Sequence, residues 1–159
     1  MTSLPPVPSS PHPLVTRAQR LACDLLVPNA ERVDQGEVPA SHIAAVKRSG
    51  LLGVSAPKRY GGAEAPVAVA RETAEILAGA CCSTWFVQTQ HQTPVKMLAT
   101  YDSPARAKLL RPLATGGLLA GIAYAHVRAF PRVPVRAAAD RGGWRFEGRV
   151  PWYTGWGLN

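Results

Sequence analysis

The stretch that decides the fold is residues 102–125, which read DSPARAKLLRPLATGGLLAGIAYA. Its first half predicts a helix, because Ser103 is a capping residue, a proline occupies the first helical position, and leucines recur at helical spacing. Its second half follows a helix-ending glycine pair and is an apolar, strand-like run over residues 118–125. The hydrophobic period therefore changes from helical to strand-like at this point of the chain.

The sequence before this point has the pattern of four further helices. They are expected from Leu14 onwards, from Ala40 to Ser49, from Pro66 to Gly79, and from a cap at Ser83 or Thr84 to about Leu98. Pro28 should kink or interrupt the first of them near its last turns. Residues 1–13 contain five prolines and no charged side chain, so we expect a flexible leader there.

The sequence after this point has the pattern of antiparallel strands. A candidate strand over Val133–Ala139 is followed by a turn at residues 140–143, and alternation then places Trp144, Phe146, Gly148, Val150 and Trp152 on one face. Helices that precede strands indicate an α+β fold, with a five-helix all-α domain over residues 14–117 and the beginning of an antiparallel β domain over residues 118–159.

The same alternation puts Trp152 and Thr154 on one strand face. An indole beside a hydroxyl suits a planar heteroaromatic ligand. The alternative from spacing alone is that Trp152 belongs to the core and Thr154 is an ordinary strand residue.

Composition excludes several classes of protein. With 47% hydrophobic and 18% charged residues, the chain has the composition of a globular protein rather than a disordered tail. There is no run of about 18 apolar residues and no signal peptide, so we expect a cytoplasmic protein without a membrane span. The cysteines are odd in number and include the adjacent pair Cys81 and Cys82, and the four histidines are scattered, which favours buried cysteines over a disulfide framework or a metal site.

The net charge of +8 is concentrated in the last third of the chain. Residues 105–159 contain nine Lys or Arg against Asp140 and Glu147, which gives +7 there. Such a region could face the phosphates of a cofactor or of a nucleic acid, or it could be a solvated surface. A non-enzymatic basic module that binds nucleic acid or a protein partner therefore stays open as an alternative.

Four segments in this order resemble the acyl-CoA dehydrogenase family. They are GLLGVSAPKRYGG at residues 50–62, Cys82-Ser83-Thr84 at a helix start, LRPLATG at residues 110–116, and Trp152-Tyr153-Thr154. The resemblance covers residues 14–159. It implies a helical domain, a central β domain and a C-terminal four-helix bundle; the bundle is absent from these 159 residues, so we expect a truncated or split-gene product.

The resemblance also implies an FAD cofactor and assigns contacts to it. Trp152 and Thr154 match the family motif that lines the flavin ring, and Tyr124 and Ala125 stand in the first β segment, which contacts the flavin in the family. The usual Thr-Glu-Pro and Gly-Ser-Asp runs are replaced here by residues 123–132, so standard acyl-CoA specificity is in doubt. Within that stretch Arg128 and Arg132 are candidates for binding a phosphate of CoA or FAD, with solvent-facing arginines as the alternative.

The implied reaction is the α,β-dehydrogenation of an acyl-CoA thioester, with electron-transferring flavoprotein or oxygen as the acceptor. The catalytic base of the family comes from the absent bundle, so none is assigned here, and we expect this polypeptide to be inactive alone and homo-oligomeric when full-length. A flavin-dependent monooxygenase of the same fold, which would use FMN, is the alternative, and His91 is then a candidate substrate-side or functional residue.

Overall fold

The computed structural model describes residues 12–124, 131–155 and 157–158. The helices are α1 (Pro13–Leu21), α2 (Val27–Asp34), α3 (Ala40–Arg48), α4 (Val67–Ala80), α5 (Cys82–Thr100) and α6 (Pro104–Thr115), and a hairpin of β1 (Val135–Asp140) and β2 (Gly143–Gly148) follows them. A π-helical turn, η1 (Ala22–Leu26), joins α1 to α2, so these two helices form one continuous helical rod. With α3, α4, α5 and α6 the described residues therefore contain five helical rods, and they contain one antiparallel sheet. The predicted α+β class is confirmed.

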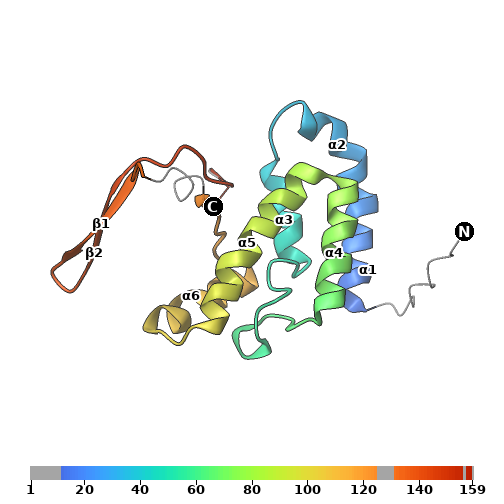
Figure 1. The fold of residues 1–159 in the computed structure, drawn as a ribbon. Coiled ribbons are helices and arrows are strands. Elements are labelled where there is room, and N and C mark those ends of the chain that lie inside the picture. Colours follow the sequence, from blue (N-terminus) through green and yellow to red (C-terminus); the bar gives the residue numbers. More distant parts are fainter. Residues whose placement is uncertain (1–11, 125–130, 156, 159) are drawn as a thin grey trace, which may run out of the picture.

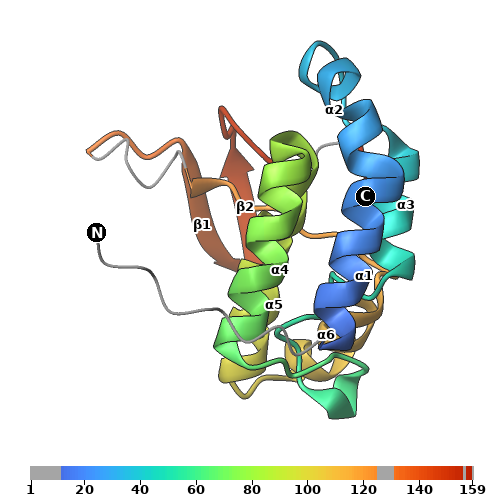
Figure 2. The ribbon, with the colours of Figure 1, turned by 90° about the vertical axis from the view of Figure 1, so that its right-hand side faces the viewer.

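The helices form two layers beside an extended hairpin. One layer contains α4 and α5 and the other contains α1 and α3, while α6 packs against α5 (Figures 1 and 2). The hairpin extends away from the helices (Figure 1). No helix in the described ranges has the length and apolarity needed to span a bilayer.

The helical geometry changes just before Pro28, where the sequence predicts a kink or an interruption, but the chain remains helical there. Proline lacks an N–H and clashes with the carbonyl four residues earlier. The π-helical turn ends two residues before Pro28, and the Asn29 side-chain amide donates to the Leu25 carbonyl oxygen at 2.8 Å. A local change of helical geometry therefore accommodates the proline without ending the rod.

The main core lies between the two layers and includes the loop that follows α3. Leu51, Leu52 and Val54 of that loop are at most 2% exposed and join leucines of α1, η1 and α4. The loop after α3 is therefore apolar and part of the core. Of the three cysteines, Cys81 is buried as expected, whereas Cys23 and Cys82 are exposed.

The start of α5 differs from the prediction. The helix begins at Cys82, and neither Ser83 nor Thr84 caps it. Thr84 is fully buried inside the first turn, where its hydroxyl lies 3.0 Å from Nδ1 of His42 and accepts a weak hydrogen bond from the Cys81 thiol at 3.2 Å. A partner on α3 therefore draws the hydroxyl away from the backbone N–H groups that a cap would bind.

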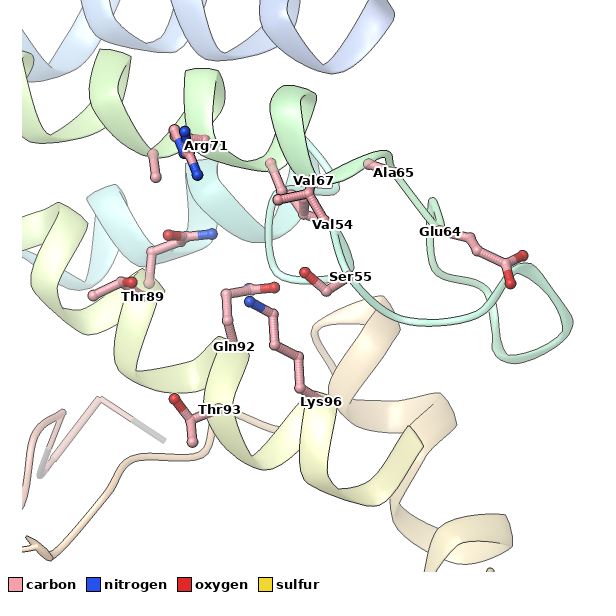
Figure 3. A pocket seen from close by; sticks show the side chains of 13 residues that line it. Val54, Ser55, Glu64, Ala65, Val67, Arg71, Thr89, Gln92, Thr93 and Lys96 are labelled. Atoms are coloured by element: carbon pink, nitrogen blue, oxygen red, sulfur yellow. The ribbon is translucent and has the colours of Figure 1, made fainter. Parts of the chain in front are cut away.

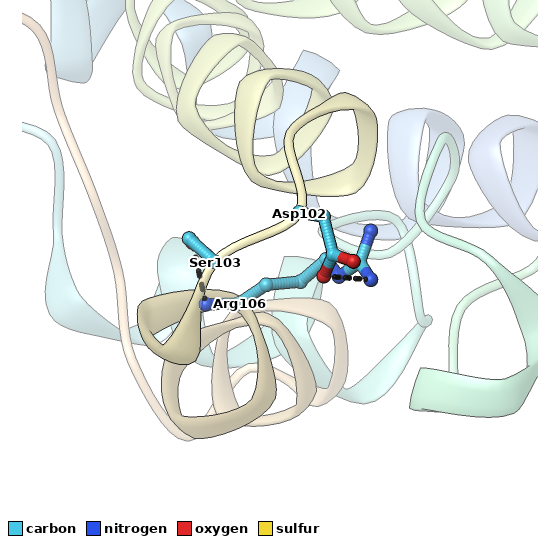
Figure 4. A network of polar contacts seen from close by, with 3 residues as sticks. All are labelled: Asp102, Ser103 and Arg106. Atoms are coloured by element: carbon cyan, nitrogen blue, oxygen red, sulfur yellow. Dashed lines mark hydrogen bonds and ion pairs between the residues drawn. The ribbon is translucent and has the colours of Figure 1, made fainter.

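The predicted start of α6 is confirmed. The Ser103 hydroxyl accepts the Arg106 backbone N–H at 3.2 Å, and Asp102 forms an ion pair with the Arg106 guanidinium at 2.6 Å (Figure 4). The helix ends at Gly116, whose φ of 82° is the left-handed conformation of a helix C-cap.

The strand predictions hold only in part. β1 and β2 pair around a turn at Arg141-Gly142, both with positive φ, as the predicted hairpin requires. The run from Leu118, in its described part to residue 124, forms no strand, because a strand needs a neighbouring ladder and its N–H groups are used elsewhere. The amide of Ala120 donates to His91, and the amide of Gly121 donates to Tyr153.

The second strand is also shorter than the alternation predicts. β2 ends at Gly148, whose φ of 140° is open chiefly to glycine, and Pro151 follows. Trp152 therefore lies in irregular chain and Thr154 at the start of a turn, rather than both on a strand face. Trp144 and Phe146 do share a face with Ala137 and Ala139, but both aromatic side chains are about 70% exposed, at 68% and 70%.

Candidate functional site

A cavity of about 710 Å³ lies where residues 152–155 and 157–158, here called the C-terminal turn, meet the start of α5. Trp152, Tyr153 and Thr154 line it from the turn, and Phe86 and Val87 line it from the helix; the remaining lining residues are Glu37, Val38, Ser83, Gly155, Gly157 and Leu158. Three aromatic side chains and the hydroxyls of Ser83 and Thr154 therefore surround a space within the size range of ordinary ligand sites.

The turn is held in place by the helical core. The Gly121 amide donates to the Tyr153 hydroxyl at 3.0 Å, and Leu158 packs against the main core. The backbone approach is so close that a Cβ added to Gly121 would lie 2.1 Å from the Thr154 carbonyl oxygen. The segment from residue 118, predicted as a strand, thus lies between the helices and the turn and holds the turn in place.

Trp152 and Thr154 contact each other, as their predicted pairing requires, although through turn geometry. The Trp152 indole N–H donates to the Thr154 hydroxyl oxygen at 3.3 Å. Thr154 is 8% exposed, whereas Trp152 is 63% exposed and presents an open ring. Since a hydroxyl that accepts one hydrogen bond keeps its own O–H to donate, this pair offers a stacking surface beside a directed donor.

The other predicted cofactor and phosphate contacts are not gathered at this cavity. Tyr124 is 56% exposed and Arg132 is exposed, and neither lines a described cavity. Ala125 and Arg128 lie outside the described residues. The alternation also gave no signal for Phe86 and Val87, because their contribution depends on how α5 packs against the turn.

His91 occupies a structural position rather than a cavity wall. It is fully buried, its Nε2 donates to the Leu113 carbonyl oxygen at 3.1 Å, and its Nδ1 accepts the Ala120 N–H at 3.0 Å. Burial is the main cause that lowers the pKa of His91, and the charge of Lys47 adds to it. The neutral imidazole therefore joins α5 to the end of α6 and to the segment that positions the turn, and its contact with substrate stays a prediction.

A second cavity, of about 520 Å³, lies between α4, α5 and the loop around Val54 (Figure 3). Its α5 side carries Gln88, Thr89, Gln92, Thr93 and Lys96. The sequence pattern did not predict this cavity, although glutamines four residues apart on one helix lie on the same face and are a recognisable signal of a polar stripe.

Comparisons with known proteins point to one family. Residues 12–117, about two thirds of the chain, match the family described as "Acyl-CoA dehydrogenase, N-terminal domain". No curated protein sequence matches the chain.

Solved structures share the fold at low sequence identity. The apo form of PigA is 22% identical, with a TM-score of 0.80 over 96% of this chain and 43% of its own. The structure described as PigA with FAD and proline gives 22% identity and a TM-score of 0.78 over 96% of this chain and 42% of its own. An electron transferring flavoprotein of Acidaminococcus fermentans is 20% identical, with a TM-score of 0.74 over 89% of this chain and 39% of its own.

These 159 residues span less than half the length of each of those structures. The helical rods, the antiparallel hairpin and the match over residues 12–117 agree with one another. The chain belongs to the acyl-CoA dehydrogenase family, through the N-terminal helical domain of that family.

Proposed function

We propose that this chain forms part of the flavin site of an FAD-dependent oxidoreductase that dehydrogenates an acyl thioester. The observation that carries the proposal is the buried Thr154 hydroxyl beside the open Trp152 indole, at an aromatic cavity, in a member of this family. The relative described as PigA with FAD and proline supports FAD as the cofactor.

The residues of the cavity suit a flavin ring. The Trp152 indole would stack on a planar ring, the Thr154 O–H would donate to a ring acceptor, and Phe86 and Val87 would shield the ring from water. When bound, FAD would supply the hydride acceptor of the reaction. Tyr124, Ala125, Arg128 and Arg132 remain proposed contacts to the flavin or to phosphate groups.

The finer parts of the proposal concern the whole protein. We propose an acyl-CoA or related acyl thioester as substrate, electron-transferring flavoprotein as acceptor, and a homo-oligomer as the working form. We further propose two domains: a helical domain over residues 14–117 and the beginning of a β domain over residues 118–159.

Titration of the purified chain with FAD, followed by flavin fluorescence, tests the cofactor. We expect saturable quenching, at least tenfold weaker binding for Thr154→Val, and near-normal binding for Thr154→Ser, which keeps the hydroxyl. Thr115→Val is the matched control, because Thr115 is exposed and lies outside the cavity. Equal affinity of Thr154→Val and the wild-type chain would refute the assigned contact. Absence of flavin binding by the chain extended with any downstream reading frame would refute the flavin site.

Two assays separate the alternatives. Flavin bleaching by acyl thioesters without oxygen supports dehydrogenation, whereas product formation that needs oxygen and supplied reduced flavin, including FMN, supports a monooxygenase. A steep dependence of nucleic-acid binding on salt concentration would instead favour the basic binding module.

A further inference from the structure

Polar and charged residues outnumber apolar residues in the lining of the cavity between α4 and α5. Eight of its 13 lining residues are polar or charged, and the other five are alanines or valines. It uses residues of α5 different from those at the Trp152–Thr154 cavity. A lining of this kind matches a small polar ligand better than a long aliphatic chain.

Two buried glutamines in this lining have unpaired oxygens. Gln88 is 4% exposed and donates through Nε2 to the Leu51 carbonyl oxygen at 2.8 Å, and Gln92 is 9% exposed and donates to the Leu52 carbonyl oxygen at 2.9 Å. These bonds orient both amides and leave both Oε1 atoms shielded from solvent, without a hydrogen-bond partner among the described residues. A buried carbonyl oxygen is stabilised by an O–H or N–H donor, and a ligand in the cavity would provide one.

Positive charge lies beside these acceptors. Arg71 of α4 and Lys96 of α5 line the cavity, and neither forms an ion pair with another described residue. Lys96, Gln92 and Ser55 extend towards the same hollow, while Glu64 lies at its far edge (Figure 3). The cavity therefore combines cationic groups for a carboxylate with acceptors for a hydroxyl or an amine.

We propose that this cavity binds a small hydroxy acid or amino acid. Its carboxylate would pair with Lys96 and Arg71, and its O–H or N–H group would donate to the Gln92 oxygen, with Gln88 as the second acceptor. An unsubstituted aliphatic acid would satisfy the cations but leave both glutamine oxygens unpaired. This site goes beyond the proposed flavin function and does not depend on it.

Three acids with the same four-carbon skeleton test the proposal: butyrate, 3-hydroxybutyrate and 3-aminobutyrate. Each would be titrated into the chain labelled with ¹⁵N at glutamine, and the side-chain amide signals of Gln88 and Gln92 would be followed by NMR. We expect 3-hydroxybutyrate, 3-aminobutyrate or both to shift these signals and to bind at least tenfold more tightly than butyrate. The stronger of the two identifies the donor as a hydroxyl or an amine.

Variants separate the cationic part of the site from the acceptor part. Lys96→Met and Arg71→Met should each weaken binding of the preferred acid about tenfold, whereas Lys108→Met, an exposed lysine of α6 outside the cavity, should leave it unchanged. Gln92→Leu should remove the preference over butyrate. Gln92→Leu also removes the donor to the Leu52 carbonyl oxygen and could unfold the chain. In that case Lys96→Met and Arg71→Met, which replace exposed side chains, test the proposal.

Three results would overturn the proposal: no binding of any of the three acids, equal affinity for butyrate, or equal effects of Lys96→Met and Lys108→Met. Titration of the same sample with FAD reports on the flavin site separately. Failure of one proposal is therefore distinguishable from failure of the other.

Discussion

Replacing His91 by leucine should destabilise the fold, because this side chain joins three backbone segments. The substitution removes the bond to the Leu113 carbonyl at 3.1 Å and the bond from the Ala120 N–H at 3.0 Å. Each buried backbone group left unpaired costs about 1–3 kcal/mol. The Leu113 carbonyl keeps the Gly116 N–H at 3.3 Å, so only the Ala120 N–H is left unpaired. The expected loss is therefore about 1–3 kcal/mol in the free energy of unfolding, against the roughly 5–15 kcal/mol of an ordinary domain.

The same residue should make stability depend on pH. Nδ1 of His91 accepts a hydrogen bond, which a protonated imidazole cannot do, and burial lowers its pKa below the ordinary value of 6.5. The unfolded chain then binds the proton more readily than the folded chain. The stabilisation is fully present above about pH 6.5 and is lost as pH falls from there through the lowered pKa, by at most about 1.4 kcal/mol per pH unit.

Urea denaturation at pH 7.5 and at pH 5.5, followed by circular dichroism, measures both effects. Gln90→Leu is the matched control, because Gln90 precedes His91 on α5 and lines none of the described cavities; its stability should change by less than about 0.5 kcal/mol. We expect His91→Leu to have a lower midpoint at pH 7.5 and a smaller loss on acidification than the wild type. A loss of less than about 1 kcal/mol at pH 7.5 would refute the structural role of His91.

Three further perturbations test other parts of the structure. His42 is buried and its pKa is lowered, mainly by burial, so His42→Leu should also reduce the loss of stability below pH 6.5, measured by the same titration; an unchanged pH profile would contradict this. Ser103→Ala removes the cap on the Arg106 N–H and should cost about 1 kcal/mol in urea denaturation, whereas Ser103→Asp should be near neutral. Gly121→Ala places a methyl group against the Thr154 carbonyl oxygen, so FAD affinity should fall at least tenfold while the far-UV spectrum stays helical; normal affinity would show that this approach does not position the turn.

Much of the helical part was predictable because it depends on local signals. Leucine spacing, the Ser103 cap and Pro28 act within a few residues, and the structure has α6 and the interruption of the first rod where these signals place them. The start of α5 was not predictable in this way, because the Thr84 hydroxyl binds His42, 42 residues away in the chain. The strand predicted from Leu118 failed for a related reason: apolar runs do not show which groups will pair with their backbone.

By itself, the sequence determined the class of fold, the family, and the pairing of Trp152 with Thr154, since these depend on composition, order and close spacing. Only the tertiary structure decided that this pair lies in a turn against α5, that His91 is a buried link between backbone segments, and that Gln88 and Gln92 present unpaired oxygens beside Lys96. Periodicity reports which face of an element is apolar. It does not report which distant carbonyl, hydroxyl or ring comes to rest against that face, because such contacts arise only when the helices pack.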